Sequence, residues 1–385
     1  MFLPPWCRHV PYYLTSFFER RVVTVEKKIR IGIRGLGLLG FRIARAAQLS
    51  SDMEVAVGVA VPDKALDELL IRVEFHPQTR QALPRKIYLA VPRHIGRESD
   101  FVKQYNAKQR IIHFEGVSQL CLRNECDCIV DTAYPAGKQD AVVQQYATFP
   151  GNIIVQDGAF PEGVLIAPPV IPADGMRREP GNLYRMADCI LSGVVPLINA
   201  LHETASKISL SLLTQYNGRE PDYLIAERAG AVYVRQDIRE RVEQDISTLF
   251  PEVEVDVQSV IQIPSLLHYQ GTLTMHFASG MSRQDVLDVL AHTPRICLLP
   301  TGVSSTYPIN LARSMCDSLP SILVFSDSVS VRNTADQCIV RIIFAIYYRT
   351  AAVYSNLDAI RMLCNTDGCK TPIDIMRRTD KEAGF

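Results

Sequence analysis

The chain has 385 residues, which is long enough for two domains that each bury a core of their own. Its 41 basic and 41 acidic side chains balance, so no net charge draws it onto nucleic acid or an anionic membrane. No apolar run reaches the ~18 residues that a membrane helix needs. Composition therefore argues against nucleic-acid and membrane partners, and favours a small molecule or another copy of the chain.

Ten cysteines are spread along the chain without the spacing of a disulfide framework, so we expect reduced thiols and a cytoplasmic protein. Cys126 and Cys128 form one close pair, and Cys364 and Cys369 form another. Neither pair has matching Cys or His partners at zinc-site spacing, so we expect both to be structural and no metal to bind.

Regular patterning begins at Lys27, and residues 1–27 are predicted to be a poorly ordered leader. This leader lacks the basic region, apolar stretch and cleavage site of a signal peptide.

A strand from Ile29 to Ile33 runs into Gly35-Leu-Gly37-Leu-Leu-Gly40 and then into a helix from Phe41 to Leu49. Strands that alternate with helices follow, which predicts a parallel, doubly wound sheet of the Rossmann type over residues 28–187. The further strands are expected at Met53–Val61, Ile87–Val91, Cys126–Asp131 and Asn152–Gln156, and the intervening helices at Ala65–Val73 and Gln139–Tyr146.

The pattern changes over residues 188–335, where we expect an α+β domain with an antiparallel sheet that serves catalysis and oligomerisation. Strands are expected at Ile208–Leu213, Val255–Ile263 and Leu273–Phe277, and helices at Asp237–Leu249 and Arg283–His292. The apolar stretch Gln337–Tyr347 is expected to be a long buried helix within residues 336–385, which return to the first domain.

The glycine loop has the context that gives a G-x-G-x-x-G pattern its meaning, since it follows a strand and opens a helix. Gly35 allows the tight turn, Gly37 lets the backbone approach a pyrophosphate, and Gly40 lets helix and strand pack closely. The helix start around Leu38 and Leu39 would point amide donors at the phosphates. We therefore expect a bound dinucleotide, and regard an ordinary strand–helix turn as the alternative.

The choice between NADP and NAD rests on the end of the second strand, where NAD sites usually carry an acidic residue. Ala60 and Val61 place no carboxylate there, and Lys64 would attract a 2′-phosphate, whereas Asp63 would repel one. The sequence favours NADP over NAD by a small margin.

Cys189 precedes an apolar run of helical character, so it is expected at a helix start, where the helix dipole lowers a thiol pKa. Beside a dinucleotide domain, such a cysteine suggests an aldehyde dehydrogenase that forms a thioester. The alternative is a small core residue.

In the order of its parts the chain resembles the glyceraldehyde-3-phosphate dehydrogenases, most closely their archaeal-type branch. The resemblance covers roughly residues 28–364. It is carried by the stretches Gly35–Gly40, Ile129–Thr132, Gly137–Gln139, Ile154–Gly158, Asp188–Gly193, Pro196–Leu197, Ile263–His268, Thr293–Ile296, Ser304–Thr306 and Asn356–Met362.

The resemblance implies that Cys189 is the nucleophile and His268 its base, and that Gly158 belongs to the cofactor site. His276, at the end of a strand, is the rival base. The resemblance also implies a homotetramer with an aldehyde as substrate.

The chain departs from the family beside the cysteine, where Asp188 and Ile190 stand in place of phosphate-binding hydroxyl residues. Asp188 would repel phosphate and raise the thiol pKa. An expected arginine is replaced by Gln215-Tyr216, for which Arg219 would compensate, and Tyr348 stands where a glutamine is expected. Asp188, Ile190 and Arg219 are the predicted substrate residues.

Three functions follow from these features. The first is an NAD(P)-dependent oxidation of a phosphorylated or related aldehyde through Cys189. The second keeps that chemistry for a less charged semialdehyde, with water or another acceptor in place of phosphate. The third is a paralogue that keeps the cofactor site but serves as a binding or regulatory module.

Overall fold

The computed structural model describes residues 28–35, 37–60, 86–90, 110–114, 126–133, 146, 149–156, 163–171, 182–215, 232–263, 268–314, 320–364 and 371–384. The predicted leader and the helix expected at 65–73 lie outside these residues, as do Val61, Asp63, Lys64 and all of the helix expected at 139–146 except Tyr146. No described helix is long and apolar enough to cross a membrane.

The first sheet is wholly parallel, with its strands in the order β4-β3-β2-β1-β5-β6-β8-β7. Its strands are β1 (Ile29–Arg34), β2 (Met53–Ala60), β3 (Lys86–Ala90), β4 (Arg110–Phe114), β5 (Cys128–Asp131), β6 (Asn152–Val155), β7 (Val164–Ile166) and β8 (Leu183–Met186). This confirms the predicted Rossmann-type sheet. Strands β4, β7 and β8 were not predicted.

The strand order reverses at β1. The chain first builds outward through β2, β3 and β4, and then returns to place β5 on the other side of β1. Helix α1 (Leu38–Leu49) begins directly after the glycine loop that ends β1. In parallel sheets, ligands bind beyond the carboxyl ends of the strands at such a reversal, so the fold positions the glycine loop at the expected place.

The second sheet is mixed, with the order β10-β11-β9-β12-β16-β14-β13 and with β15 paired to β16. Its strands are β9 (Ala205–Gln215), β10 (Tyr233–Val234), β11 (Glu254–Ile263), β12 (Tyr269–Phe277), β13 (Ile296–Leu299), β14 (Ile322–Phe325), β15 (Ser330–Asn333) and β16 (Cys338–Ile346). The pairs of β9 with β11 and of β13 with β14 are parallel, and the remaining strand pairs of this sheet are antiparallel. The α+β class is confirmed, with a mixed sheet.

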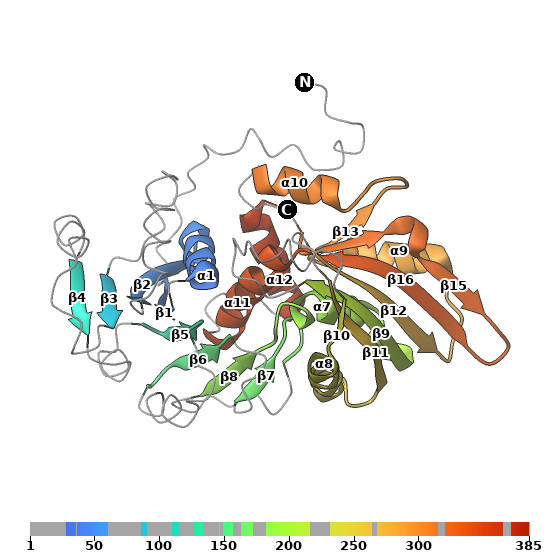
Figure 1. The fold of residues 1–385 in the computed structure, drawn as a ribbon, viewed down its shortest axis with the longest axis horizontal. Coiled ribbons are helices and arrows are strands. Elements are labelled where there is room, and N and C mark those ends of the chain that lie inside the picture. Colours follow the sequence, from blue (N-terminus) through green and yellow to red (C-terminus); the bar gives the residue numbers. More distant parts are fainter. Residues whose placement is uncertain are drawn as a thin grey trace, which may run out of the picture.

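The remaining helices are α7 (Leu191–Leu201), α8 (Gln236–Leu249), α9 (Arg283–His292), α10 (Thr306–Ser314), α11 (Tyr348–Cys364) and α12 (Pro372–Ala383), with short 3-10 turns at His202–Thr204 and Ser326–Ser328. In Figure 1, α11 and α12 lie between the two sheets.

The helix expected at Gln337–Tyr347 is wrong, because Cys338–Ile346 forms the strand β16. This strand pairs antiparallel with β12 on one side and with β14 and β15 on the other. Arg341 is the one charged residue in this otherwise apolar strand, so the local pattern resembles that of a buried helix. The helix comes next, as α11, and its side chains Val353, Leu357 and Ile360 pack into the core of the first sheet.

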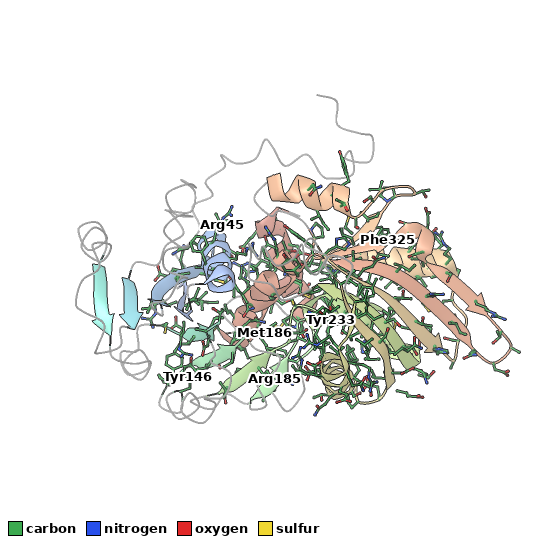
Figure 2. The ribbon with its side chains drawn as sticks, in the orientation of Figure 1. Arg45, Tyr146, Arg185, Met186, Tyr233 and Phe325 are labelled. Carbon is green, nitrogen blue, oxygen red and sulfur yellow. The ribbon has the colours of Figure 1, made fainter. Side chains whose placement is uncertain are left out.

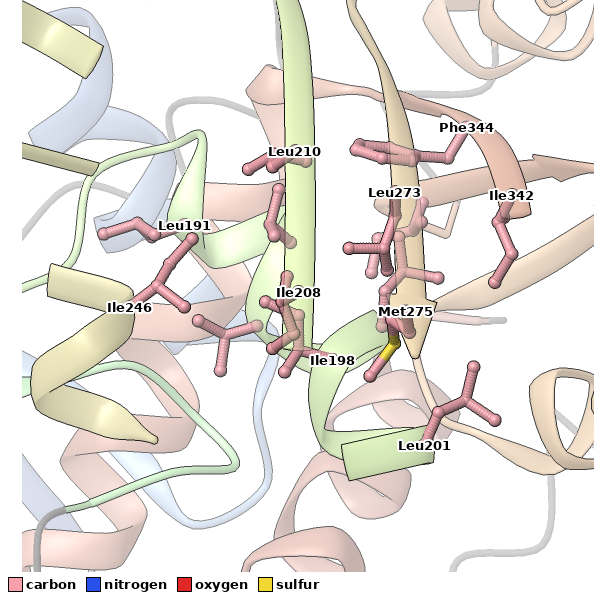
Figure 3. Packing of buried hydrophobic residues seen from close by; sticks show 14 of the residues in the cluster. Leu191, Ile198, Leu201, Ile208, Leu210, Ile246, Leu273, Met275, Ile342 and Phe344 are labelled. Atoms are coloured by element: carbon pink, nitrogen blue, oxygen red, sulfur yellow. The ribbon is translucent and has the colours of Figure 1, made fainter. Parts of the chain in front are cut away.

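The largest core lies in the second half of the chain. Figure 3 shows helix α7 contributing Leu191, Ile198 and Leu201, which pack with Ile208 and Leu210 of β9. Leu273 and Met275 of β12 and Ile342 and Phe344 of β16 continue the same cluster. This packing fixes the start of α7, and with it Cys189, against the second sheet.

Candidate functional site

The three glycines of the loop differ in their steric surroundings. Gly35 has a φ of +88°, and a Cβ there would lie 2.6 Å from the Cβ of Ala133. A Cβ on Gly40 would lie 1.9 Å from the carbonyl oxygen of Gly35. A Cβ on Gly37, in contrast, would meet nothing within 4 Å in the described part of the chain. Two glycines are therefore required by the fold, and no described residue lies close above the third.

A side-chain hydrogen bond joins the carboxyl ends of β1 and β5 beside this loop. Arg34 Nη1 donates to Asp131 Oδ2 at 2.6 Å, and the Tyr146 hydroxyl donates to the same oxygen at 2.6 Å. Asp131 Oδ1 accepts from the backbone N–H of Ala133 at 2.9 Å. Burial raises the pKa of Tyr146 well above its ordinary value, so this hydroxyl keeps its proton. Figure 2 labels Tyr146 beside the first sheet.

Cys189 lies between β8 and α7, at the place where the chain leaves the first sheet. Its Sγ is 3.2 Å from the hydroxyl of Tyr269, the first residue of β12. The ring of Tyr269 stacks on that of Tyr348, the first residue of α11, with centroids 5.6 Å apart. The thiol is thus partly buried where α7, β12 and α11 all begin.

The expected lowering of the Cys189 pKa by the helix start is wrong. Burial, followed by the negative charge of Asp188, raises the pKa of this thiol to about 12. The hydrogen bond with Tyr269 and the charge of Arg241 act in the opposite direction but are weaker. In this environment the loss of solvation outweighs the partial charge of the helix end.

Asp188 has partners for both of its carboxylate oxygens. Oδ1 accepts hydrogen bonds from the backbone N–H groups of Ile190 and Leu191, both at 2.9 Å. Oδ2 accepts from Nη2 of Arg241, on α8, at 2.8 Å. The carboxylate therefore caps the first turn of α7 and forms an ion pair with Arg241.

His268 directly precedes Tyr269, and its Nε2 is 3.3 Å from Oγ of Ser305. Burial lowers the pKa of its imidazole below the ordinary value, which favours the neutral ring. The rival His276 lies seven residues further along β12, about 23 Å from Tyr269 at the usual rise of a strand. Of the two histidines, His268 is the one beside the residue that contacts Cys189.

The other predicted site residues are three described apolar residues and two residues that lie outside the described part of the chain. Ile190 is 5% exposed and its side chain belongs to the core, so the structure gives no support to a substrate contact through that side chain. Leu38 begins α1, and Leu39 packs against the core of the first sheet. Gly158 and Arg219 lie outside the described residues.

Sequence reasoning did not single out Tyr269, Arg241, Gln156 or Asn356. Nε2 of Gln156 donates to the carbonyl oxygen of Ala187 at 3.3 Å, and Nδ2 of Asn356 donates to Oε1 of Gln156. Asn356 is fully buried, yet its Oδ1 has no hydrogen-bond partner among the described residues. Gln156 and Asn356 gave a signal in the sequence, since each lies in a stretch that carries the resemblance.

In the part of the chain that the structure describes, no three His, Cys, Asp or Glu side chains are grouped so that they could hold a metal ion.

Together, the parallel sheet, its glycine loop and the adjoining mixed sheet define a Rossmann-type protein with a second α+β unit. No known family profile matches the sequence. The chain is 24% identical to glyceraldehyde-3-phosphate dehydrogenase of Aeropyrum pernix over 367 residues, which covers 93% of this chain and 98% of the relative. It is 22% identical to the protein of the same name from Pyrococcus abyssi over 366 residues, covering 93% and 99%.

A shorter match, 35% identical over 136 residues, links the chain to glyceraldehyde-3-phosphate dehydrogenase of Metallosphaera sedula and covers 33% of this chain and 38% of that relative. These likenesses confirm the expected resemblance. The chain is a divergent relative of the archaeal-type glyceraldehyde-3-phosphate dehydrogenases.

Proposed function

We propose that this protein is an NAD(P)-dependent aldehyde oxidoreductase of the glyceraldehyde-3-phosphate dehydrogenase type. The observation that carries the proposal is the position of Cys189, partly buried between the Rossmann-type sheet and the second sheet and in contact with Tyr269. Likeness to relatives of that name over 93% of the chain supports the class of reaction. By the same likeness we propose a cytoplasmic homotetramer.

The cofactor is NADP or NAD, and two features of the chain fit such a group. No described residue lies close above Gly37, so a pyrophosphate would reach the backbone at the start of α1. The buried Oδ1 of Asn356 would accept a hydrogen bond from a carboxamide. When bound, the nicotinamide supplies a two-electron acceptor for hydride.

The chain's own residues would carry out the remaining chemistry. Sγ of Cys189 bonds to the aldehyde carbon, and the thiol proton leaves toward His268 as that bond forms. Because the pKa of Cys189 is raised to about 12, little thiolate exists beforehand, so proton removal has to accompany attack. The lowered pKa of His268 keeps its ring neutral and able to accept that proton. Loss of hydride oxidises the carbon to a thioester, which an acyl acceptor then cleaves.

The identity of the acceptor depends on Asp188 and Arg241. Nη2 of Arg241 is paired with the carboxylate of Asp188, so the positive charge that acts on Cys189 is already engaged. Inorganic phosphate is then a poor acceptor, and water or another nucleophile takes its place. This favours a semialdehyde without a phosphate group as the alternative substrate.

A second candidate function follows from the raised thiol pKa. A cysteine that stays protonated and is hydrogen-bonded to a tyrosine suits a catalytically degenerate paralogue that binds the cofactor and serves regulation.

The test is a turnover screen of the purified protein with NAD and NADP against a panel of aldehydes, with and without phosphate. Cys189→Ser should abolish turnover and leave cofactor affinity unchanged. Cys297→Ser is the matched control, since Cys297 is also partly buried but lies in β13. Turnover that survives in Cys189→Ser would exclude the cysteine mechanism. No turnover with any aldehyde, together with tight cofactor binding, would leave the regulatory paralogue.

Gly37→Val tests the cofactor site separately. A Cβ at this position would meet no described atom within 4 Å, so the variant should fold normally while losing at least a few kcal/mol of cofactor binding. Calorimetry that gives the parent affinity would show that the loop does not bind the cofactor.

A further inference from the structure

Two cysteines from distant parts of the sequence lie together in the core of the first sheet. Cys128 is the first residue of β5 and is fully buried, and Cys364 is the last residue of α11 and packs against the same core. Asn152 is the neighbour of Cys128 in the register of β5 and β6, and its Nδ2 donates to the carbonyl oxygen of Leu363 at 3.2 Å. This hydrogen bond holds the end of α11 beside β5 and β6 (Figure 1).

The thiols of Cys128 and Cys364 contact each other. A hydrogen bond with Cys364, followed by burial, raises the pKa of the Cys128 thiol well above its ordinary value. Both sulfurs also act on the hydroxyl of Tyr184 in β8, whose pKa is raised first by burial and then by the two cysteines. Cys128 begins β5, so the pair lies toward the amino ends of the parallel strands, whereas the glycine loop lies at their carboxyl ends. The pair is therefore separate from the proposed active site.

Access to solvent differs between the two thiols. Cys364 is half-buried at the end of its helix, whereas Cys128 is fully buried. A small oxidant from the solvent therefore reaches Cys364 first, and the thiol of Cys128 is already in place to react with the product. Helix ends open more readily than helix interiors, so Cys364 can make the small shift that an S–S bond of about 2.0 Å requires.

We propose that Cys128 and Cys364 form an oxidation site, at which a peroxide converts the two thiols into a reversible disulfide. The thiolate of Cys364 attacks one oxygen of hydrogen peroxide, the O–O bond breaks, and the departing hydroxide takes up the proton that Cys364 released and becomes water. Sγ of Cys128 then attacks the sulfur of the sulfenic acid formed on Cys364. The S–O bond breaks, and the departing hydroxide takes up the thiol proton of Cys128 as a second water. The two thiols together lose two electrons, and one peroxide is reduced to two waters.

The disulfide would fasten the end of α11 to β5. The same helix begins at Tyr348, which stacks on Tyr269, and it carries Asn356, which donates to Oε1 of Gln156. Oxidation would therefore fix in place a helix whose other end lies beside the proposed active site, without using the thiol of Cys189.

Hydrogen peroxide is the probe, and the full-length Cys189→Ser protein is the sample, so that the thiol of the proposed active site takes no part. Trypsin places Cys128 in the peptide Asn124–Lys138 and Cys364 in the peptide Met362–Lys370. Mass spectrometry without a reductant should show these two peptides joined after treatment of the folded protein. Dithiothreitol should separate them again.

Single variants in the same background assign the bond, because the two peptides also contain Cys126 and Cys369. Cys364→Ser and Cys128→Ala should each abolish the joined peptide, whereas the matched controls Cys126→Ala and Cys369→Ser should keep it. Cys364 is half-buried, so Cys364→Ser should melt at nearly the parent temperature by differential scanning fluorimetry, and it keeps the test valid if Cys128→Ala unfolds.

The proposal is overturned if no joined peptide forms in the folded protein, if the joined peptide persists in Cys364→Ser, or if it is lost in Cys126→Ala or Cys369→Ser. It is also overturned if the joined peptide forms only in urea, which would mean that the two thiols react only after the chain unfolds.

Discussion

Sγ of Cys189 lies 3.2 Å from the hydroxyl of Tyr269, and this contact joins the start of α7 to the start of β12. The hydrogen bond lowers the thiol pKa, against the larger raising effects of burial and Asp188. Tyr269 in turn stacks on Tyr348 of α11. The reactivity of the cysteine therefore depends on residues more than 70 positions away in the sequence.

Tyr269→Phe should slow alkylation of Cys189 by iodoacetamide about tenfold, because the thiolate loses a hydrogen bond while the ring stays in place. The rate is read from the peptide that carries Cys189 by mass spectrometry. Cys297 in the same sample serves as the internal reference. Faster alkylation of Cys189 would mean that the hydroxyl shields the sulfur more than it stabilises the thiolate.

Alkylation of Cys189 should rise about tenfold per pH unit from neutral pH to about pH 10, with no plateau, since its pKa is raised to about 12. The folded pKa lies above the unfolded value, so the folded state holds the proton more tightly. The resulting stability is complete below the unfolded pKa near 9.0 and is lost as pH rises through about 12. A plateau near neutral pH would contradict the raised pKa.

Asp188→Asn should speed alkylation of Cys189. The amide oxygen still accepts from the N–H groups at the start of α7, but the negative charge that raises the thiol pKa is gone. Asp237→Asn is the control, since it removes a carboxylate that is bound to Arg235 on the surface of α8. An unchanged rate in Asp188→Asn would show that burial alone sets the pKa.

Asp188→Ser should introduce a dependence of turnover on phosphate, if the protein is the proposed oxidoreductase. The serine hydroxyl preserves a cap for α7, and Arg241 loses its carboxylate partner and becomes available to an anion. The native protein should be insensitive to phosphate. Strong phosphate stimulation of the native protein would show that the pair of Asp188 and Arg241 opens to admit the anion.

Arg361→Met should destabilise the fold by about 3–5 kcal/mol, measured by urea unfolding, because the buried Asp52 loses both of its short hydrogen bonds to the guanidinium and keeps the longer ion pair with Arg378 at 3.4 Å. Arg361 is fully buried and donates two hydrogen bonds to Asp52, at 2.9 and 2.8 Å, besides its ion pair with Glu382. Arg377→Met is the matched control on α12, where an exposed pair with Asp374 is worth less than about 1 kcal/mol. Equal losses in both variants would refute the role of burial.

The sequence by itself determined the features that depend on neighbouring residues. The glycine loop was predictable because a tight turn and a close helix approach require glycine at fixed spacing, as Gly35 and Gly40 show. Helix Arg283–His292 was predicted with its observed bounds, since its serine cap and charged face are local signals. The alternation of strands and helices likewise led to the Rossmann-type sheet and the α+β second half.

Only the tertiary structure decided what depends on distant partners. Cys338–Ile346 becomes a strand because β12 and β14 supply hydrogen bonds on both of its edges, which no local pattern records. Burial of Cys189 and the charge of Asp188 reverse the pKa expected from a helix start, against the weaker effects of Tyr269 and Arg241. Solvation and charge at a side chain are set by whatever the fold packs around it, and here those groups come from three separate elements.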